Sequence, residues 1–146
     1  MKSYNLTWTA TVVCAFMLFM TSHMLAQSVR VKNRNGEAVV YVDGSTLRER
    51  NRNGEALYYL DGQTIRQRNR NGEAVYYIDG NVVKERNRNG QALFYFDEMT
   101  IRTQSRNGEA LYFIDGNTLR YKNRNGEAAY YFDGLPEKWV IACLMR

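Results

Sequence analysis

Basic and aromatic side chains that recur every 18 residues are the groups in this 146-residue chain with the clearest capacity for binding. The basic residues of this series are Arg48, Arg66, Lys84, Arg102 and Arg120, and the aromatic residues are Tyr59, Tyr77 and Tyr95. A surface that combines repeated cations with aromatic rings can attract anionic lipid headgroups or acidic glycans. These eight residues are therefore the candidate ligand-binding residues. The alternative is structural: the cations pair across strands with glutamates of the Glu55 type, and such surface pairs contribute little stability.

Patterns for catalysis and for metal binding are missing from the repeated part of the chain. The single histidine, His23, lies in an N-terminal segment that we expect to be removed. Histidine-based general acid–base catalysis and histidine metal ligation are therefore excluded in the mature chain. The aspartates of the Asp-Gly pairs recur in every repeat, and turns favour aspartate for local hydrogen bonds. We interpret them as structural residues, and we expect no enzyme activity, no cofactor and no metal site.

An 18-residue unit occurs six times without insertions, starting at residues 33, 51, 69, 87, 105 and 123. All eleven glycines follow either Asn or Asp in this unit. Asn-Gly and Asp-Gly are typical of two-residue hairpin turns, and the segments between them are short and rich in β-branched or aromatic residues. Each unit is therefore predicted to form two antiparallel strands and two tight turns. In the fourth unit Glu98 replaces the second glycine, so we expect a different turn type there.

The two predicted turns fix which side chains share a face. A turn centred on Asp61-Gly62 places Leu60 opposite Gln63 and Tyr58 opposite Ile65. The predicted core face carries Ala56, Tyr58, Leu60 and Ile65, and the predicted outer face carries Glu55, Leu57, Tyr59, Thr64, Arg66 and Arg68. Both turns give the same faces, which supports a continuous antiparallel meander.

The segment Met1–Ala26 has the layout of a secretory signal peptide. It contains Lys2 and an apolar run from Ala10 to Met20, and we place the cleavage between Ala26 and Gln27. Export to the periplasm, to the outer envelope or out of the cell follows. The alternative is an uncleaved leader that anchors the protein in the membrane. The remaining chain has nineteen basic and fifteen acidic residues, a formal charge of +4.

The two ends of the repeated region complement each other. Gln27–Lys32 corresponds to half a unit, whereas the second half of the last unit is replaced by LPEKWV, which contains the only proline, Pro136. A closed ring requires the half-unit to pair with residues 127–132, and closure removes exposed sheet edges. An open superhelix is the alternative. We assign residues 27–134 to the repeat domain.

The apolar tail, residues 135–146, is the part of the mature chain that does not repeat. We interpret it as a cap or plug of the core, with an insertion or docking segment as the alternative. It contains Cys143, the one cysteine left after the leader. This thiol is either a buried apolar residue or an intermolecular link.

The sequence NRNGEALYYLDGQTIR, at residues 51–66, resembles the repeat of the bacterial β-flower family. The matching features are the Asn-Gly pair, the small Ala56, the pair Tyr58-Tyr59, the Asp-Gly pair and the Ile65-Arg66 end, and the resemblance covers about Gln27–Gly134. It implies short hairpin petals arranged radially around an apolar centre, and it brings no established catalytic residues. The best-known members have four petals, whereas this chain has six units. Choline-binding cell-wall repeats are a weaker resemblance, because their tryptophan cages have no counterpart in these strands.

We therefore expect an all-β antiparallel hairpin repeat protein, a closed sixfold β-flower-like ring in the form of a shallow barrel. Its expected role is that of a non-enzymatic binding module of the bacterial envelope for anionic lipid or glycan. The alternative role is a structural or protein-interaction scaffold with another envelope protein as partner. Nucleic acid is not an expected partner of an exported protein. The sequence leaves the oligomeric state open.

Overall fold

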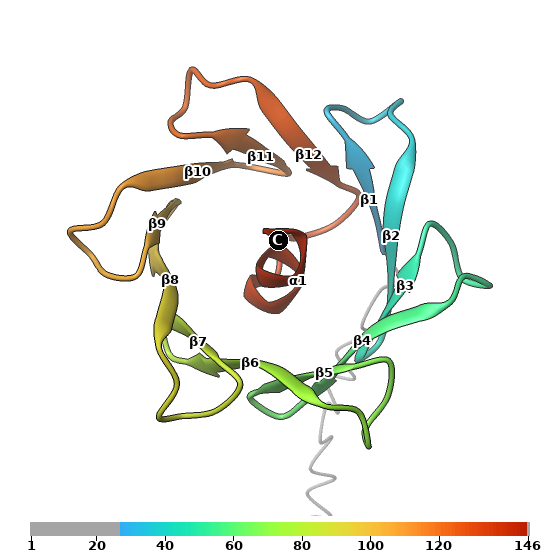
Figure 1. Cartoon of the computed structure of the whole chain (residues 1–146). Coiled ribbons are helices and arrows are strands. Elements are labelled where there is room, and N and C mark those ends of the chain that lie inside the picture. Colours follow the sequence, from blue (N-terminus) through green and yellow to red (C-terminus); the bar gives the residue numbers. More distant parts are fainter. Residues whose placement is uncertain (1–26, 146) are drawn as a thin grey trace, which may run out of the picture.

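Twelve strands and one helix make up the described part of the chain, residues 27–145 of a computed structural model (Figure 1). The first six strands are β1 (Gln27–Val31), β2 (Ala38–Asp43), β3 (Thr46–Glu49), β4 (Ala56–Asp61), β5 (Thr64–Gln67) and β6 (Ala74–Asp79). The others are β7 (Val82–Glu85), β8 (Ala92–Asp97), β9 (Thr100–Thr103), β10 (Ala110–Asp115), β11 (Thr118–Tyr121) and β12 (Ala128–Phe132). The helix α1 spans Lys138–Leu144. The predicted signal peptide and its cleavage site at Ala26 lie outside the described residues.

The strands form one closed antiparallel barrel in which each strand pairs with its neighbours in sequence. The ring is closed by β1 and β12, with Val29 opposite Phe132 and Arg30 opposite Tyr131. The pairing of the N-terminal half-unit with the last repeat confirms the predicted closed ring, and the open superhelix is wrong. Closure leaves none of the twelve strands with an unpaired edge, which protects these tyrosine-rich strands from pairing with other chains.

The turns after the aspartates are shifted by one residue from the prediction. Asp61 pairs with Thr64, so the two central residues are Gly62 and Gln63 rather than Asp61 and Gly62. Gly62 has a φ of 62°, and a glycine at the first central position is typical of a type II′ turn. Moving a turn by one residue shifts every cross-strand partner by two positions. A shift of two positions leaves each side chain on the same side of the sheet, so the wrong turn position does not by itself change the predicted faces.

The fourth unit makes the same turn without the glycine. Glu98 has a φ of 53°, close to that of the turn glycines, and Asp97 pairs with Thr100 as in the other units. The prediction of a different turn type for this unit is wrong. The ring forces the geometry of this turn, and Glu98 adopts a left-handed conformation that is unfavourable for a residue with a Cβ atom.

The Asn-Gly segments form longer loops instead of two-residue turns. In the loop between β3 and β4, Arg50 has a φ of 56°, and the Asn51 side chain accepts a hydrogen bond from the Asn53 amide. The backbone amide of Glu49 donates to the carbonyl of Glu55 and closes the loop. Gly54 is needed because a Cβ atom there would overlap the backbone carbonyl oxygen of Glu49. The glycine thus permits a close backbone approach and has no positive φ, contrary to the prediction.

A β-bulge follows each of these loops. Between β3 and β4 the register shifts after Leu47, which pairs with Tyr58, so that Arg48 pairs with Ala56. The extra residue, Leu57, packs partly against the core, although the sequence placed it on the outer face. Three core assignments are confirmed: Ile65 and Tyr58 are buried, and Leu60 packs against the buried cluster. Ala56 is half-buried and is not part of that cluster, because the bulge pairs it with Arg48.

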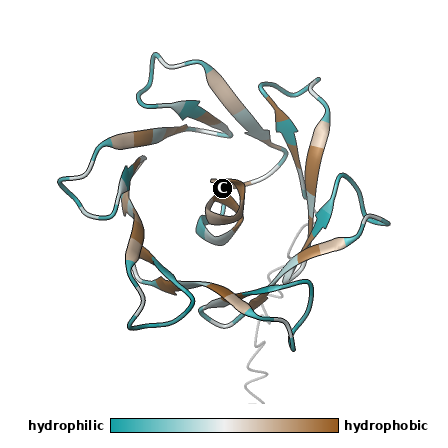
Figure 2. Ribbon diagram, viewed as in Figure 1, coloured by the Kyte–Doolittle hydropathy of each residue, from teal (hydrophilic) through white to brown (hydrophobic). Residues whose placement is uncertain are grey.

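Helix α1 fills the centre of the ring (Figures 1 and 2). Its five consecutive residues 139–143, WVIAC, are buried among the inward-facing strand residues. Seven residues are too few for a helix that is stable on its own, so burial must stabilise it. Cys143 is a buried thiol on this helix. Within residues 27–145, no helix has the length and hydropathy needed to span a bilayer.

Polar contacts to the turns fix the start of the tail. The Gln27 side chain donates to the carbonyl of Leu135, and Asn117 donates to the carbonyls of Phe132 and Gly134. Across the ring, Lys138 Nζ lies 2.7 Å from Asn81 Oδ1. The helix therefore begins on the side of the ring that carries the Gly-X turns, which we call the turn face.

Candidate binding surface

Six cations on the strands, which we call the strand cations, each pair with an aspartate that precedes a turn. The distances are 3.4 Å for Arg48–Asp43, 3.2 Å for Arg66–Asp61, 2.8 Å for Lys84–Asp79, 3.3 Å for Arg102–Asp97, 2.9 Å for Arg120–Asp115 and 3.4 Å for Arg30–Asp133. In five of the pairs the cation lies five residues after its aspartate, as the third residue of the returning strand. The sixth pair joins the N-terminal half-unit to the last repeat, so the same contact also closes the ring.

Each strand arginine makes a second contact, to the loop that follows its strand. Arg48 Nη1 donates to the carbonyl of Gly54 at 3.3 Å, and the other four arginines repeat this bond. Lys84 instead donates to the carbonyl of Arg88 at 3.0 Å. The planar guanidinium has separate donors for two partners, which suits it to this bridge between a turn and a loop. The structure thus places five of the predicted ligand-binding residues in internal contacts, with about a third of each arginine side chain exposed.

Lys84 also changes the acidity of its partner. The hydrogen bond from Lys84, followed by its charge, lowers the pKa of Asp79 below the ordinary value, and the charge of Arg88 adds a smaller effect. A hydrogen bond to the charged form of a carboxyl group favours ionisation. Asp79 therefore stays negatively charged and continues to hold the lysine in acid down to a lower pH than a free aspartate.

The predicted tyrosines lie beside the strand cations. Tyr59 is opposite Arg66, Tyr77 is opposite Lys84 and Tyr95 is opposite Arg102. All three rings are half-buried, and the Tyr77 hydroxyl donates to Gln63 at 2.6 Å. Within residues 27–145, the cation–π contact joins Lys138 to Phe96, and none joins a strand cation to one of these tyrosines. The eight predicted ligand-binding residues therefore lie together on the outside of the barrel, and their cations contact aspartates.

A second series of arginines lies in the loops at the outer ends of the hairpins, which we call the petal tips (Figure 1). These tip arginines are exposed and comprise Arg34, Arg52, Arg70, Arg88, Arg106 and Arg124. Arg70 and Arg106 approach aspartates at 4.0 and 3.9 Å. The other four have no ion-pair partner within 4.0 Å among the described residues. Sequence reasoning did not single out this series, although Arg-Asn-Gly recurs in all six units.

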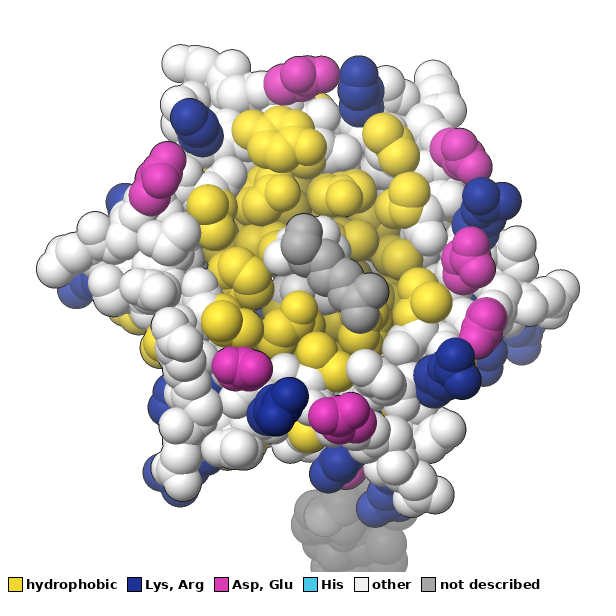
Figure 3. Space-filling model, viewed as in Figure 1, with side chains coloured by type: hydrophobic (Ala, Val, Ile, Leu, Met, Phe, Trp, Pro, Cys, Tyr) yellow, Lys and Arg dark blue, Asp and Glu magenta, His cyan; other side chains and the backbone are white. Residues whose placement is uncertain are grey.

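The side of the ring opposite the turn face is apolar. Apolar side chains surround the end of α1 there, and acidic and basic side chains encircle them (Figure 3). We call this side the apolar face, and it is formed by Ala56, Leu57, Tyr58 and their equivalents in each repeat. The β-bulge creates it, because the bulge turns a second residue in succession, such as Leu57, towards the centre. The alternating pattern of the strand sequence does not indicate where a bulge occurs, so sequence analysis did not predict this face.

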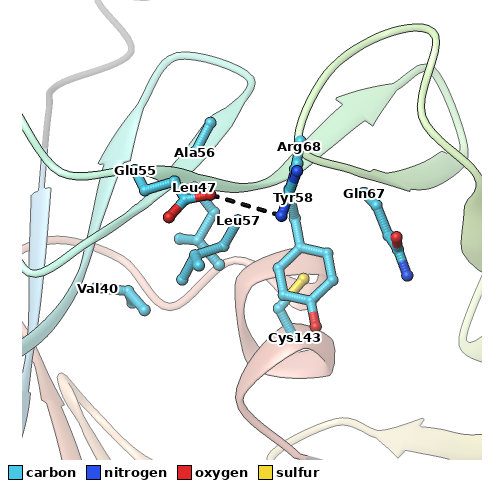
Figure 4. A pocket seen from close by; sticks show the side chains of 9 residues that line it. All are labelled: Val40, Leu47, Glu55, Ala56, Leu57, Tyr58, Gln67, Arg68 and Cys143. Carbon is cyan, nitrogen blue, oxygen red and sulfur yellow. Dashed lines mark ion pairs between the residues drawn. The ribbon is translucent and has the colours of Figure 1, made fainter.

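Grooves on the apolar face separate adjacent petals. One cavity of about 460 Å³ has Leu57, Tyr58 and Cys143 among its lining residues, and the pair Glu55–Arg68 at 3.7 Å stands at its edge (Figure 4). Equivalent residues of other repeats line cavities of about 550 and 360 Å³. The same arrangement of an apolar floor and a charged edge therefore recurs around the ring.

One groove carries a tyrosine cluster that the other repeats lack. Tyr121 occupies the position of Gln67 and Glu85, and its ring lies 5.4 Å from that of Tyr112. Burial, followed by the nearby Tyr121, raises the pKa of Tyr112 and of Tyr130. Both hydroxyls therefore stay neutral in mildly alkaline solution, and this groove remains uncharged at its floor.

Comparison with known families identifies the architecture. The model of a family described as 6-fold beta flower protein matches residues 29–143. This chain belongs to the sixfold β-flower family. The match confirms the resemblance drawn from the repeat, and it settles the number of petals at six rather than four. No curated protein and no solved structure matches the chain.

The β-flower family indicates a non-enzymatic repeat protein, and it is not a known enzyme family. Within residues 27–145, no group of three or more His, Cys, Asp or Glu side chains is placed to hold a metal ion. The aspartates before the turns are instead spread around the ring, each beside its own cation. The arrangement can thus present repeated charges and repeated grooves to a partner.

Proposed function

We propose that this β-flower is a binding module of the bacterial envelope that holds an anionic partner, either lipid headgroups or an acidic glycan, at its petal tips. The observation that carries the proposal is the set of exposed tip arginines, four of which have no ion-pair partner within 4.0 Å among the described residues. The strand cations support the proposal in a different way. They hold turns and loops together, and so they fix the positions from which the tip arginines project.

The charge distribution favours this division of roles. Repeated cations at the end of six rigid hairpins raise the local concentration of an anionic partner, and several weak contacts act together. The strand cations are neutralised by their aspartates, and so they add little to the attraction. The formal charge of +4 after removal of the expected leader resides mainly on the tips.

Export of the protein remains part of the proposal and rests on the signal-peptide layout of residues 1–26. Strand β1 begins at Gln27, directly after the expected cleavage site, and every described strand and the helix lie after this point. Cleavage between Ala26 and Gln27 would therefore remove no part of the ring. The chain from Gln27 to Arg146 contains the complete closed barrel with its central helix, and it is the form to use in binding experiments.

Co-sedimentation with anionic and with neutral vesicles, together with retention on beads carrying an acidic polysaccharide, tests the proposal in a salt series. We expect retention by an anionic surface that weakens as salt rises, because salt screens exposed charges. Binding to vesicles alone would identify headgroups as the partner, and binding to the beads alone would identify a glycan. Failure to bind either surface at low salt would contradict the proposal.

Two variants that remove equal charge locate the contact. The tip variant replaces Arg34, Arg52, Arg88 and Arg124 by Gln, and the control variant replaces Arg50, Arg68, Arg86 and Lys122 by Gln. The control residues are also exposed, but Glu49, Glu55 and Glu85 lie close to three of them. We expect the tip variant to lose at least about tenfold in affinity and the control variant to lose less. Equal losses would show that net charge, rather than the tips, attracts the partner.

A further inference from the structure

The apolar face is a second surface that the proposed function does not use. The aliphatic residues that follow the small alanines, among them Leu57, Leu93 and Leu111, are half-buried there rather than covered. Leu144, at the end of α1, is half-buried at the centre of the same face. A ring of apolar side chains around an apolar centre is typical of a surface that another molecule covers.

The charged edge of this face alternates in sign. Five repeats contribute a residue of the Glu55 type, which is matched by a residue of the Arg68 type, and these two lie 3.7 Å apart in the second repeat. Lys32 and Glu127 form the equivalent pair where the ring closes, at 3.4 Å. The acidic members are Glu37, Glu55, Glu73, Glu109 and Glu127, and the basic members are Lys32, Arg50, Arg68, Arg86 and Lys122. The edge therefore carries five charges of each sign.

The fourth repeat changes both members of its pair together. Gln91 takes the place of the glutamate, and Gln104 takes the place of the basic residue. This repeat thus has a neutral pair rather than a single unbalanced charge. The balance of acid and base at the edge is preserved in all six repeats, which a purely solvated surface does not require.

We infer that two copies of this chain associate through their apolar faces. An edge with alternating charges is complementary to itself, because a twofold axis parallel to the face can place each glutamate opposite a basic residue of the other copy. Such an isologous contact is the usual arrangement of a homodimer. It would cover the half-buried Leu57, Leu93 and Leu111 of both copies and the ends of both helices.

The distribution of charge favours a second copy over a membrane. The edge has as many acidic as basic residues, and Glu49 and Glu85 add further negative charge beside it. This face therefore offers no net attraction to anionic lipid. Side-by-side contacts between rings are disfavoured because the exposed tip arginines of two copies would repel each other.

Sedimentation velocity of the chain 27–146, from about 1 to 100 μM, tests the inference. We expect a dimer whose dissociation constant rises at least about tenfold in the Leu93→Lys variant, because the lysine would enter the contact. Leu93 lines a groove and is half-buried, so the ring can keep its fold, and circular dichroism checks this. Arg52→Glu at a petal tip is the control and is expected to leave the dimer unchanged.

Charge reversal at the edge provides a test that does not alter the apolar floor. Arg68→Glu is expected to weaken the dimer, because the new glutamate would lie opposite an acidic residue of the other copy. A monomer at all concentrations would overturn the inference. So would a dimer that neither Leu93→Lys nor Arg68→Glu weakens, and so would a monomer that binds neutral vesicles through Leu93. These results are independent of the tip variants that test anion binding.

Discussion

The strand cations and the tip arginines lie only four residues apart in every repeat, yet four of the six tip arginines lack the ion pair that every strand cation makes. Arg48 contacts Asp43 and the carbonyl of Gly54, whereas Arg52 is exposed and has no ion-pair partner within 4.0 Å among the described residues. Both series have the same residue types and the same 18-residue spacing. Spacing alone therefore cannot tell a structural cation from one that is available to a ligand. The deciding feature is a carboxylate at the end of the neighbouring strand.

Removal of one member from each series should give the largest difference. Arg48→Ala leaves Asp43 and a loop carbonyl without their donor, so we expect the free energy of unfolding to fall by about 1–2 kcal/mol. Arg52→Ala removes no described contact, and the change should stay within about 0.5 kcal/mol. Urea denaturation followed by circular dichroism measures both values. Equal losses in the two variants would remove the distinction between the series.

The turn that carries Asp97 allows a test of how firmly the ring holds the strand pairs. Glu98→Gly removes a side chain from a left-handed conformation, and we expect the free energy of unfolding to rise by about 1 kcal/mol. Gly62→Ala introduces the same strain at the equivalent turn and should lower stability by a similar amount. Thermal unfolding measures both shifts. A Glu98→Gly variant that is less stable would show that the glutamate side chain makes a contact that compensates for its backbone.

Lys84 is the strand cation that lacks the forked guanidinium. Lys84→Arg restores the geometry of the other five strand cations, with one donor for Asp79 and another for a loop carbonyl. We expect a gain of roughly 0.5 kcal/mol in the free energy of unfolding. Lys122→Arg, at an exposed position, is the matched control and should change stability much less. No gain from Lys84→Arg would mean that lysine already satisfies both partners.

The pKa of Asp79 reports the influence of one strand cation, Lys84, and one tip arginine, Arg88, on the same carboxyl group. It is lowered mainly by Lys84 and only slightly by Arg88, a tip arginine. Lys84→Met should therefore raise this pKa towards the ordinary value, and Arg88→Met should raise it less, as NMR titration of the carboxyl carbon can show. Because the folded pKa is lowered, the pair's contribution to stability is present above the ordinary pKa. It is lost as the pH falls through the folded pKa.

The closed ring could be predicted from the sequence because several independent signals agree. The repeat period, the half-unit at Gln27–Lys32 and the irregular last repeat together favoured the pairing of β1 with β12 over an open superhelix. The core residues Tyr58 and Ile65 were also assigned correctly, because a register error of two positions does not move a side chain to the other face.

The positions of the turns and the partners of the cations could not be predicted. Asp-Gly suits a turn at Asp61-Gly62 as well as one at Gly62-Gln63, and only the pairing of the strands selects the second. The glycine of Asn-Gly is required by a backbone contact with residue 49 that no local signal reveals. Because the predicted register was shifted by two positions, the contact of Arg66 with Asp61 was not foreseen.

Hydrogen exchange at the arginine Nε–H groups tests the distinction between the two series most directly. In Arg30, Arg48, Arg66, Arg102 and Arg120 this group donates to an aspartate at 2.9–3.4 Å. We predict five slowly exchanging Nε–H signals from these residues, and rapid exchange at the exposed tip arginines. Titration with anionic vesicles or with an acidic polysaccharide should then perturb only the rapidly exchanging set. Equal protection in both sets, or perturbation of the five slow signals first, would contradict the assignment of ligand binding to the petal tips.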